Sequence, residues 1–370
     1  MFDRRLIENF DWGFLGVISL ICSAGLVILY SAVTAGADSA ALHTLLKKQM
    51  IWMGAGFVIM AGSLIIDFRE LDKLNLFIYV ICVGLLISTY LFGQMGGGSR
   101  RWLVMGAVRM QPSELMKISL IISLAAVYSD NVVSQEGLGF RNLIKPLILC
   151  LIPFALIVKQ PDLGTGLLLM LIAGSITFFV KVQKKVIFTL AGIGLAIVPL
   201  VWFFGLKEYQ KGRILTFLNP DRDPLGAGYH IIQSKIAIGS GMITGKGFLQ
   251  GTQNALNFLP EQHTDFILSV LAEEWGLVGC GVFLILYLIL LFWGLNIAYA
   301  CRSMFGSILA FGITVMIFWQ IFINIGMVMG LMPVVGVPLP LISYGGSSVV
   351  TNMVGFGILL NISMRKFTKS

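Results

Sequence analysis

The chain alternates long apolar runs with short polar segments, and this pattern predicts a bundle of membrane-spanning helices. A run of about 20 apolar residues crosses the hydrocarbon core of a bilayer as a helix. We therefore expect an all-α polytopic membrane protein, folded as one domain over residues 1–370, with both termini on the same side. Its ten expected spans lie at about residues 12–33, 50–66, 74–93, 114–129, 143–158, 163–181, 186–205, 266–298, 307–331 and 344–363.

The longest polar segment, residues 206–265, is expected to be a loop between the seventh and eighth spans. Residues 219–228 are rich in turn-forming residues. Residues 229–238 then predict an amphipathic helix on the membrane surface or over the bundle, with Ile231, Ile232, Ile236 and Ile238 opposite Gln233, Ser234 and Lys235.

Residues 93–112 and 331–348 hold clusters of glycine and proline, which indicate irregular backbone at membrane depth. Such backbone is tolerated only where it is buried in protein or lines a wet cavity. Together with the long loop, these segments predict a cavity that opens on one face of the membrane.

Composition supports membrane integration, because 57% of the residues are hydrophobic and only 12% are charged. The net charge of +8 comes from scattered basic residues, which argues against a nucleic-acid interface. If the termini are cytoplasmic, 13 Lys and Arg residues lie in inner segments and 7 in short outer segments. This excess favours cytoplasmic termini, with the long loop and the cavity outside.

A basic cluster on the expected outer face comprises Arg100, Arg101 and Arg109, followed by Glu114 and Lys117 on one helix face. Arginine and lysine near a helix N-terminus suit phosphate binding, with Glu114 orienting the ammonium of Lys117. The structural alternative is a self-neutralising i,i+3 pair whose lysine reaches outward to solvent.

Carboxylates mark two other positions on the same face. Asp162 lies in a very short connection and could cap the next helix, act in the site, or do both. Asp265 begins the eighth span and could be a helix cap or a general base with a pKa raised beside apolar walls. Glu273 and Glu274 are too far along that span to pair with Asp265, so we expect them to form hydrogen bonds with other helices.

The residues contain no metal-ligand spacing, nucleophile elbow or dinucleotide fingerprint, and residues 241–247 fail the phosphate-loop spacing. From the residues alone we expect an outward cavity suited to an anionic, phosphorylated amphiphile.

Four strings of the sequence carry a resemblance that covers essentially the whole chain. They are residues 219–241 (NPDRDPLGAGYHIIQSKIAIGSG), 259–267 (LPEQHTDFI), 335–340 (VGVPLP) and 343–347 (SYGGS). The chain thereby resembles the SEDS family (shape, elongation, division and sporulation), and the PLGAGYH and QSK strings are similar to its elongation branch.

This resemblance implies a peptidoglycan glycosyltransferase of the bacterial inner membrane that acts during cell elongation. Its substrates would be lipid II and the nascent glycan strand, with inversion at the sugar carbon and release of undecaprenyl diphosphate. Membrane lipid surrounds such a protein, no nucleic acid is involved, and a class B penicillin-binding protein supplies the transpeptidase.

The resemblance also implies which residues form the site. Asp265 matches the family's essential carboxylate, and Glu114, Lys117 and Asp162 match functionally sensitive positions. We assign Asp265 as the catalytic base and Arg100, Arg101, Arg109, Lys117 and Lys235 as diphosphate-binding cations. Asp162 or Asp265 could instead hold Mg²⁺ or Mn²⁺. The alternative function is a lipid II flippase, which would need ionisable residues through both leaflets.

Overall fold

The computed structural model describes residues 8–34, 39–96, 99–106, 108–130, 137–223, 226–256, 258 and 262–365 of the protein. Some residues of the predicted segments lie outside these ranges. They are Gly97 and Gly98 of the glycine cluster, Pro224 and Leu225 of the turn stretch, residues 259–261, and the terminal Arg4, Arg5, Lys366 and Lys369.

Ten long helices occupy the ten expected spans, so the fold class is confirmed. They are α2 (Trp12–Thr34), α3 (Ser39–Ser63), α5 (Asn75–Phe92), α6 (Pro112–Asp130), α7 (Phe140–Lys159), α8 (Leu163–Phe179), α9 (Lys184–Leu200), α13 (Ile267–Ala300), α14 (Met304–Val328) and α15 (Gly346–Arg365). A short α4 (Phe68–Lys73) joins α3 to α5. Among the described residues, seven helices are long and apolar enough to cross a membrane, and α8 is a shorter apolar helix. The protein is therefore an integral membrane protein.

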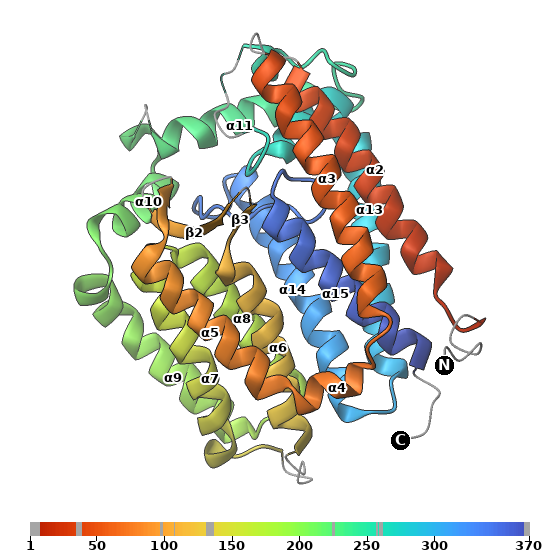
Figure 1. Ribbon diagram of the computed structural model, residues 1–370. Coiled ribbons are helices and arrows are strands. Elements are labelled where there is room, and N and C mark those ends of the chain that lie inside the picture. The colour runs from red at the N-terminus through yellow and green to blue at the C-terminus, as the bar shows by residue number, and fades with distance from the viewer. Residues whose placement is uncertain are drawn as a thin grey trace.

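The helices form a bundle in which α14 is central, because it packs against α6, α8, α13 and α15. The beginning of α2 and the end of α15 lie at the same end of this bundle (Figure 1). One boundary differs clearly from expectation, since α3 begins at Ser39 and not near residue 50. Hydropathy detects only the apolar part of a helix, whereas α3 continues past the basic Lys47 and Lys48.

Three short strands within residues 93–112 form a small antiparallel sheet, so the expectation of irregular backbone was wrong for the described part of this segment. Strands β1 (Gln94–Gly96), β2 (Ser99–Met105) and β3 (Val108–Met110) pair in sequence order. Gln94 pairs with Trp102 while Met95 pairs with Arg100, which leaves Arg101 as an extra residue in β2. Such a bulge breaks the strict alternation of side chains between the two faces of a strand.

A π-helical turn, η1 (Val201–Gly205), follows α9. The long loop then contains α10 (Glu208–Leu218), η2 (Pro220–Arg222), α11 (Ala227–Gly241) and α12 (Thr252–Ala255). The amphipathic helix is confirmed as α11, which lies across one end of the bundle and packs on α13 (Figure 1). Its buried face differs from the expected one, because Ser234 is buried and Ile236 is exposed. The Ser234 hydroxyl finds polar partners there, donating to the carbonyl of Val328 at 2.6 Å and lying 2.8 Å from the Ser269 hydroxyl.

Helix α13 is interrupted at Gly276, whose φ of 63° and ψ of −161° are not helical. The loop supplies the hydrogen bonds that this break removes. Leu277 and Val278 donate their N–H groups to the carbonyls of Met242 and Ile243, both at 3.0 Å. Lys246 and Gly247 donate in the opposite direction, to carbonyls just before the break, at 3.0 and 2.9 Å. The loop is thereby fixed against α13 on both sides of its break.

Candidate functional site

A cavity of about 570 Å³ lies at the end of the bundle that carries the sheet and the long loop. The β-sheet, α6, α10, α11, the turn before α13, and the segment between α14 and α15 all contribute to it. Its polar and charged lining residues include Arg101, Gln111, Glu114, Arg213, His230, Thr264, Asp265, Tyr344, Ser347 and Ser348. The segment of residues 331–345 is irregular, as expected, and supplies Val334, Val335, Gly336 and Pro338 to the wall.

Asp265 lines this cavity from a turn that precedes α13. The N-cap of α13 is Phe266, so the alternative in which Asp265 caps this helix was wrong. A Cβ atom placed on Gly336 would lie 3.4 Å from Oδ2 of Asp265, which puts the carboxylate directly against the 331–345 segment.

The backbone around Asp265 is held by buried polar side chains. Asn324 of α14 is 0% exposed and donates from Nδ2 to the carbonyls of Asp265 at 3.0 Å and Val337 at 2.8 Å. Ser343 donates to the carbonyl of Thr264 at 2.6 Å, and the Tyr344 N–H donates to the carbonyl of His263 at 2.9 Å. These bonds tie the turn that carries Asp265 to α14 and to the 331–345 segment.

Replacing Asn324 with leucine is therefore expected to move Asp265. The variant leaves two buried carbonyls without their donor, at about 1–3 kcal/mol each. A displacement of about 1 Å at a catalytic group can lower the rate about 10²-fold. We expect Asn324→Leu to show a lower melting temperature and, for the reaction of this site, a much lower kcat.

Asn361→Leu is the matched control for this prediction. Asn361 also donates to two carbonyls, those of Ser63 at 2.7 Å and Ile66 at 2.6 Å, but at the opposite end of the bundle. It should lose stability while retaining kcat. Equal kcat losses in the two variants would show that Asn324 does not position Asp265.

Asp162 is both a helix cap and a neighbour of the cavity. Its carboxylate accepts from the Thr165 N–H at 3.3 Å and from the Thr165 hydroxyl at 2.9 Å, which confirms the capping role. It also accepts from Nε2 of Gln111 at 3.3 Å and lies 3.7 Å from the guanidinium of Arg101. Asp162 is 3% exposed, so it holds two cavity-lining side chains in place from behind the wall.

Glu114 and Lys117 form a buried ion pair, with Nζ 2.8 Å from both carboxylate oxygens. Lys117 is 1% exposed, so the alternative in which it extends outward to solvent was wrong. Glu114 lines the cavity, whereas Lys117 is not among the described residues that line it. Lys117 therefore influences the cavity only through its ion pair with Glu114.

Arg213 is a lining residue that sequence reasoning missed. It lies on α10 and donates to the carbonyl of Val334 at 3.2 Å. Burial lowers the pKa of its guanidinium, and the positive charge of Arg101 lowers it further, while the carboxylates of Asp162 and Asp265 raise it. An anion placed between Arg101 and Arg213 would relieve both the desolvation and the repulsion. The only sequence signal was one basic residue in a polar loop, which is too common to single out.

Besides Lys117, three residues predicted to bind diphosphate lie outside the described cavity lining. Arg100 is exposed on β2. Arg109 is exposed on β3 but lies close enough to Tyr344 to offset part of the rise that burial causes in the pKa of that phenol. Lys235 is exposed on α11, and its Nζ passes over Gly330 at the end of α14.

Glu273 and Glu274 have structural partners, as expected. Glu274 accepts from the hydroxyl of Ser31 on α2 at 2.5 Å. Glu273 accepts from Lys246 at 2.6 Å and from the N–H of Gln253 at 3.1 Å, so its partners belong to the loop and not to another long helix. Both carboxylates stabilise the interrupted start of α13.

The two carboxylates proposed as Mg²⁺ or Mn²⁺ ligands differ in how well they fit a cation. Both oxygens of Asp162 already accept hydrogen bonds. Asp265 faces the cavity and could be one ligand of a cation that is otherwise held by phosphate oxygens, as is common for Mg²⁺. Within the described ranges, no group of three or more His, Cys, Asp or Glu residues could hold a metal by itself.

The chain is similar to several known proteins. The model of the FtsW/RodA/SpoVE cell cycle proteins matches residues 11–368. Peptidoglycan glycosyltransferase MrdB of Escherichia coli K12 is 42% identical over 336 residues, which cover 91% of this chain and 90% of that protein. Stage V sporulation protein E of Bacillus subtilis is 37% identical over 352 residues, covering 93% and 94%.

Two solved structures have the same fold. One, described as the structural coordination of polymerization and crosslinking by a peptidoglycan synthase complex, has a TM-score of 0.83 and 30% identity, and covers 97% of this chain and 99% of that chain. The crystal structure of the Thermus thermophilus rod shape determining protein RodA has a TM-score of 0.72 and 26% identity, and covers 97% and 98%.

Proposed function

Because the chain belongs to the FtsW/RodA/SpoVE family, we propose that it is a peptidoglycan glycosyltransferase that polymerises lipid II during cell elongation. The observation that carries this proposal is the placement of Asp265 in one cavity with two arginines, Arg101 and Arg213. A carboxylate can accept a proton from a sugar hydroxyl, and guanidinium groups can neutralise a leaving diphosphate.

The reaction needs a new bond from the 4-hydroxyl oxygen of the acceptor GlcNAc to C1 of the donor sugar. The bond from that C1 to the diphosphate oxygen breaks, and undecaprenyl diphosphate leaves. An α-linked diphosphate and a β-1,4 product imply a single inverting displacement. Asp265 takes the hydroxyl proton, while Arg101 and Arg213 stabilise the negative charge that develops on the diphosphate.

The remaining predicted residues support these three. Asp162 orients Arg101 and Gln111, and Lys117 fixes the Glu114 carboxylate at the cavity wall. Arg109, Arg100 and Lys235 are exposed and provide positive charge at this end of the bundle, which attracts an anionic lipid from the membrane surface.

The excess of Lys and Arg in the segments at the other end of the bundle supports an extracytoplasmic cavity and cytoplasmic termini in the bacterial inner membrane. Glycan strands made at such a cavity would be crosslinked outside the cell. A class B penicillin-binding protein is the proposed partner, and the similarity to a chain from a peptidoglycan synthase complex supports this assignment.

A divalent cation, Mg²⁺ or Mn²⁺, would add Lewis-acid stabilisation of the diphosphate and would have Asp265 as its protein ligand. The two arginines already supply positive charge at that place. We therefore assign Asp265 the role of base, and metal titration of an Asp265 variant separates the two roles.

Polymerisation of labelled lipid II by the purified protein tests the proposed function. Glycan strands should form with wild-type protein and be absent from an identically purified Asp265→Asn preparation, which controls for contaminating polymerases. Transport of labelled lipid II between leaflets without strand formation would support the flippase instead. Against the flippase, Glu273 and Glu274 are held in structural contacts and are not placed along a path.

Arg213→Gln is expected to lower kcat/KM for lipid II about 10- to 150-fold, because a hydrogen bond to a charged group contributes about 1.5–3 kcal/mol. Steady-state kinetics of strand synthesis measure this effect. Arg222→Gln removes an exposed arginine of the same loop and should leave the kinetics unchanged. Equal effects of the two substitutions would indicate that only the net charge of the loop matters.

A further inference from the structure

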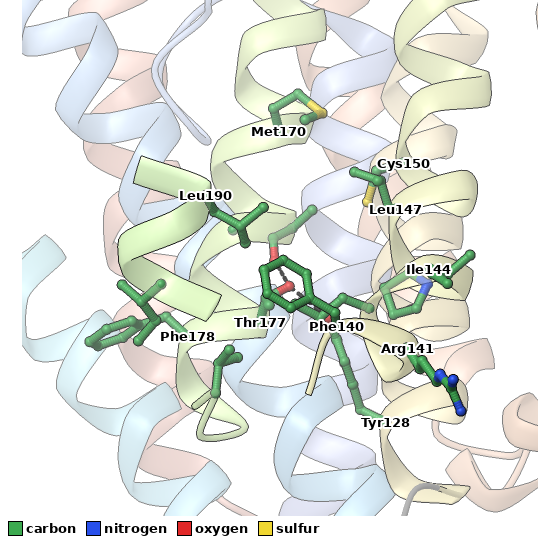
Figure 2. Close-up of a pocket in the computed structure, with 16 residues that line it drawn as sticks. Tyr128, Phe140, Arg141, Ile144, Leu147, Cys150, Met170, Thr177, Phe178 and Leu190 are labelled. Carbon is green, nitrogen blue, oxygen red and sulfur yellow. Dashed lines mark hydrogen bonds between the residues drawn. The ribbon is translucent and has the colours of Figure 1, made fainter. Parts of the chain in front are cut away.

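A second cavity, of about 620 Å³, lies between α7, α8 and α9 (Figure 2). Its lining residues on α8 extend to Phe178, whereas the catalytic cavity lies beside Asp162 at the N-terminus of that helix. Fifteen residues of helix separate Asp162 from the lining residue Thr177, which corresponds to about 22 Å. The second cavity therefore faces the opposite leaflet and is distinct from the site of polymerisation.

The interior of this cavity is suited to hydrocarbon. Its walls are mostly aliphatic and aromatic, and Figure 2 shows Leu190 and Phe178 across from Ile144 and Leu147. The hydroxyl oxygens of Tyr128 and Thr177 lie 2.7 Å apart. Thr177 donates its own hydrogen to the carbonyl of Ala173 at 2.8 Å, so Tyr128 is the donor in this pair. Both hydroxyl hydrogens therefore already form hydrogen bonds within the protein.

The lateral wall of the cavity is open to the bilayer. Helix α9 stands at the edge of the bundle (Figure 1), and Val186 is its buried residue. From Phe188 to Leu200 every residue of α9 is exposed. A chain from the surrounding membrane can therefore enter between α9 and the rest of the bundle.

The end of this cavity is marked by positive charge. Arg141 lines it, and in Figure 2 the guanidinium points away from the apolar walls. Lys145 lies about one turn further along α7, and Lys184 and Lys185 begin α9. These four side chains are exposed, and none is in an ion pair within the part of the chain that the structure describes. An apolar slot with a cationic end matches an amphiphile with an anionic headgroup.

We propose that this cavity binds one anionic phospholipid from the leaflet opposite the catalytic cavity. One acyl chain occupies the space between α7, α8 and α9, and the phosphate contacts Arg141. Arginine suits this contact because its planar fork binds phosphate with two hydrogen bonds. The lipid completes the packing of α9, and the proposal does not depend on the reaction proposed for the other cavity.

Native mass spectrometry of the full-length protein with phosphatidylglycerol or phosphatidylcholine tests this proposal. In Gly174→Phe, the new ring fills the cavity, and a Cβ at Gly174 meets no atom within 4 Å, so the backbone is not displaced. Gly192→Phe is the matched control, because Gly192 on α9 also has no atom within 4 Å and does not line the cavity. Arg302→Ala is the control for Arg141→Ala.

We expect the wild type and both controls to retain one phosphatidylglycerol and Gly174→Phe to lose it. Arg141→Ala should weaken retention about fivefold, since a basic residue near an anionic lipid surface contributes about 1 kcal/mol. Undiminished retention by Gly174→Phe would overturn the site, and equal retention of the zwitterionic phosphatidylcholine would overturn the preference for an anionic headgroup.

Displacement of the phospholipid by equimolar undecaprenyl diphosphate would also overturn the proposal, because it would assign the cavity to the substrate lipid. Asp265→Asn should retain phosphatidylglycerol whether or not the protein polymerises lipid II. The two proposals can therefore fail independently.

Discussion

Asp265→Asn is expected to lower the rate of glycan polymerisation about 10²- to 10⁴-fold, the usual contribution of a general base. The amide has nearly the shape of the carboxylate, and the backbone carbonyl of Asp265 keeps its bond from Asn324. The melting temperature and the affinity for lipid II should therefore remain close to those of the wild type. The measurement is the initial rate of strand synthesis at saturating lipid II.

Asp221→Asn is the control for this substitution. Asp221 is exposed on η2, so its substitution should not change the rate of strand synthesis. Titration with Mn²⁺ then separates the base from the metal ligand. A base predicts an Asp265→Asn rate that stays low at every Mn²⁺ concentration. If high Mn²⁺ restored the rate of Asp265→Asn, Asp265 would be reassigned as a metal ligand. If Asp265→Asn polymerised as fast as the wild type without added metal, Asp265 would have neither role.

Lys117→Met is expected to cost about 3–5 kcal/mol of stability, because it leaves the Glu114 carboxylate buried without its partner. Glu114→Gln should be destabilising for the same reason, since it leaves the ammonium of Lys117 unpaired. The double variant replaces the pair with neutral groups of similar size and should recover most of the lost stability. Thermal unfolding of the purified variants in detergent measures all three.

Activity should not follow stability in this series. Glu114 lines the cavity, so the double variant should remain inactive although it is folded. Lys73 and Glu70 provide the comparison, because they have the same i,i+3 spacing and a distance of 2.7 Å but are exposed. Their substitution by Met and Gln should leave the melting temperature unchanged. An active double variant would mean that the buried pair serves only the packing of α6.

Residue pattern alone was sufficient to predict the fold class. The length and apolarity of each span are local properties, and a bilayer accepts such runs only as helices. The amphipathic helix α11 was predictable for a similar reason. Its buried face was not, because Ser234 is satisfied by Val328 and Ser269, which are distant in sequence. A polar residue counts as surface in a periodicity pattern unless its partners are known.

The candidate site was predictable only in part. Asp265, Asp162, Glu114 and Lys117 attracted attention because charges at membrane depth are costly without a partner or a role. Which of Arg100 and Arg101 faces the cavity depends on a bulge in β2, and a bulge needs its partner strand to be defined. The resemblance of the four strings to a known family supplied the reaction, since no residue spacing specifies a sugar or an isoprenoid.

The sequence by itself determined that the protein is a membrane-spanning helical bundle with polar chemistry gathered at one end. Tertiary structure decided the composition of that end: it brought Arg213 from the loop beside Arg101, turned Lys235 away, and placed Asp265 in a turn held by Asn324. The physical reason is the separation along the chain over which each effect acts. Hydropathy acts on each segment separately, whereas a site is made by hydrogen bonds and packing between segments far apart in the chain.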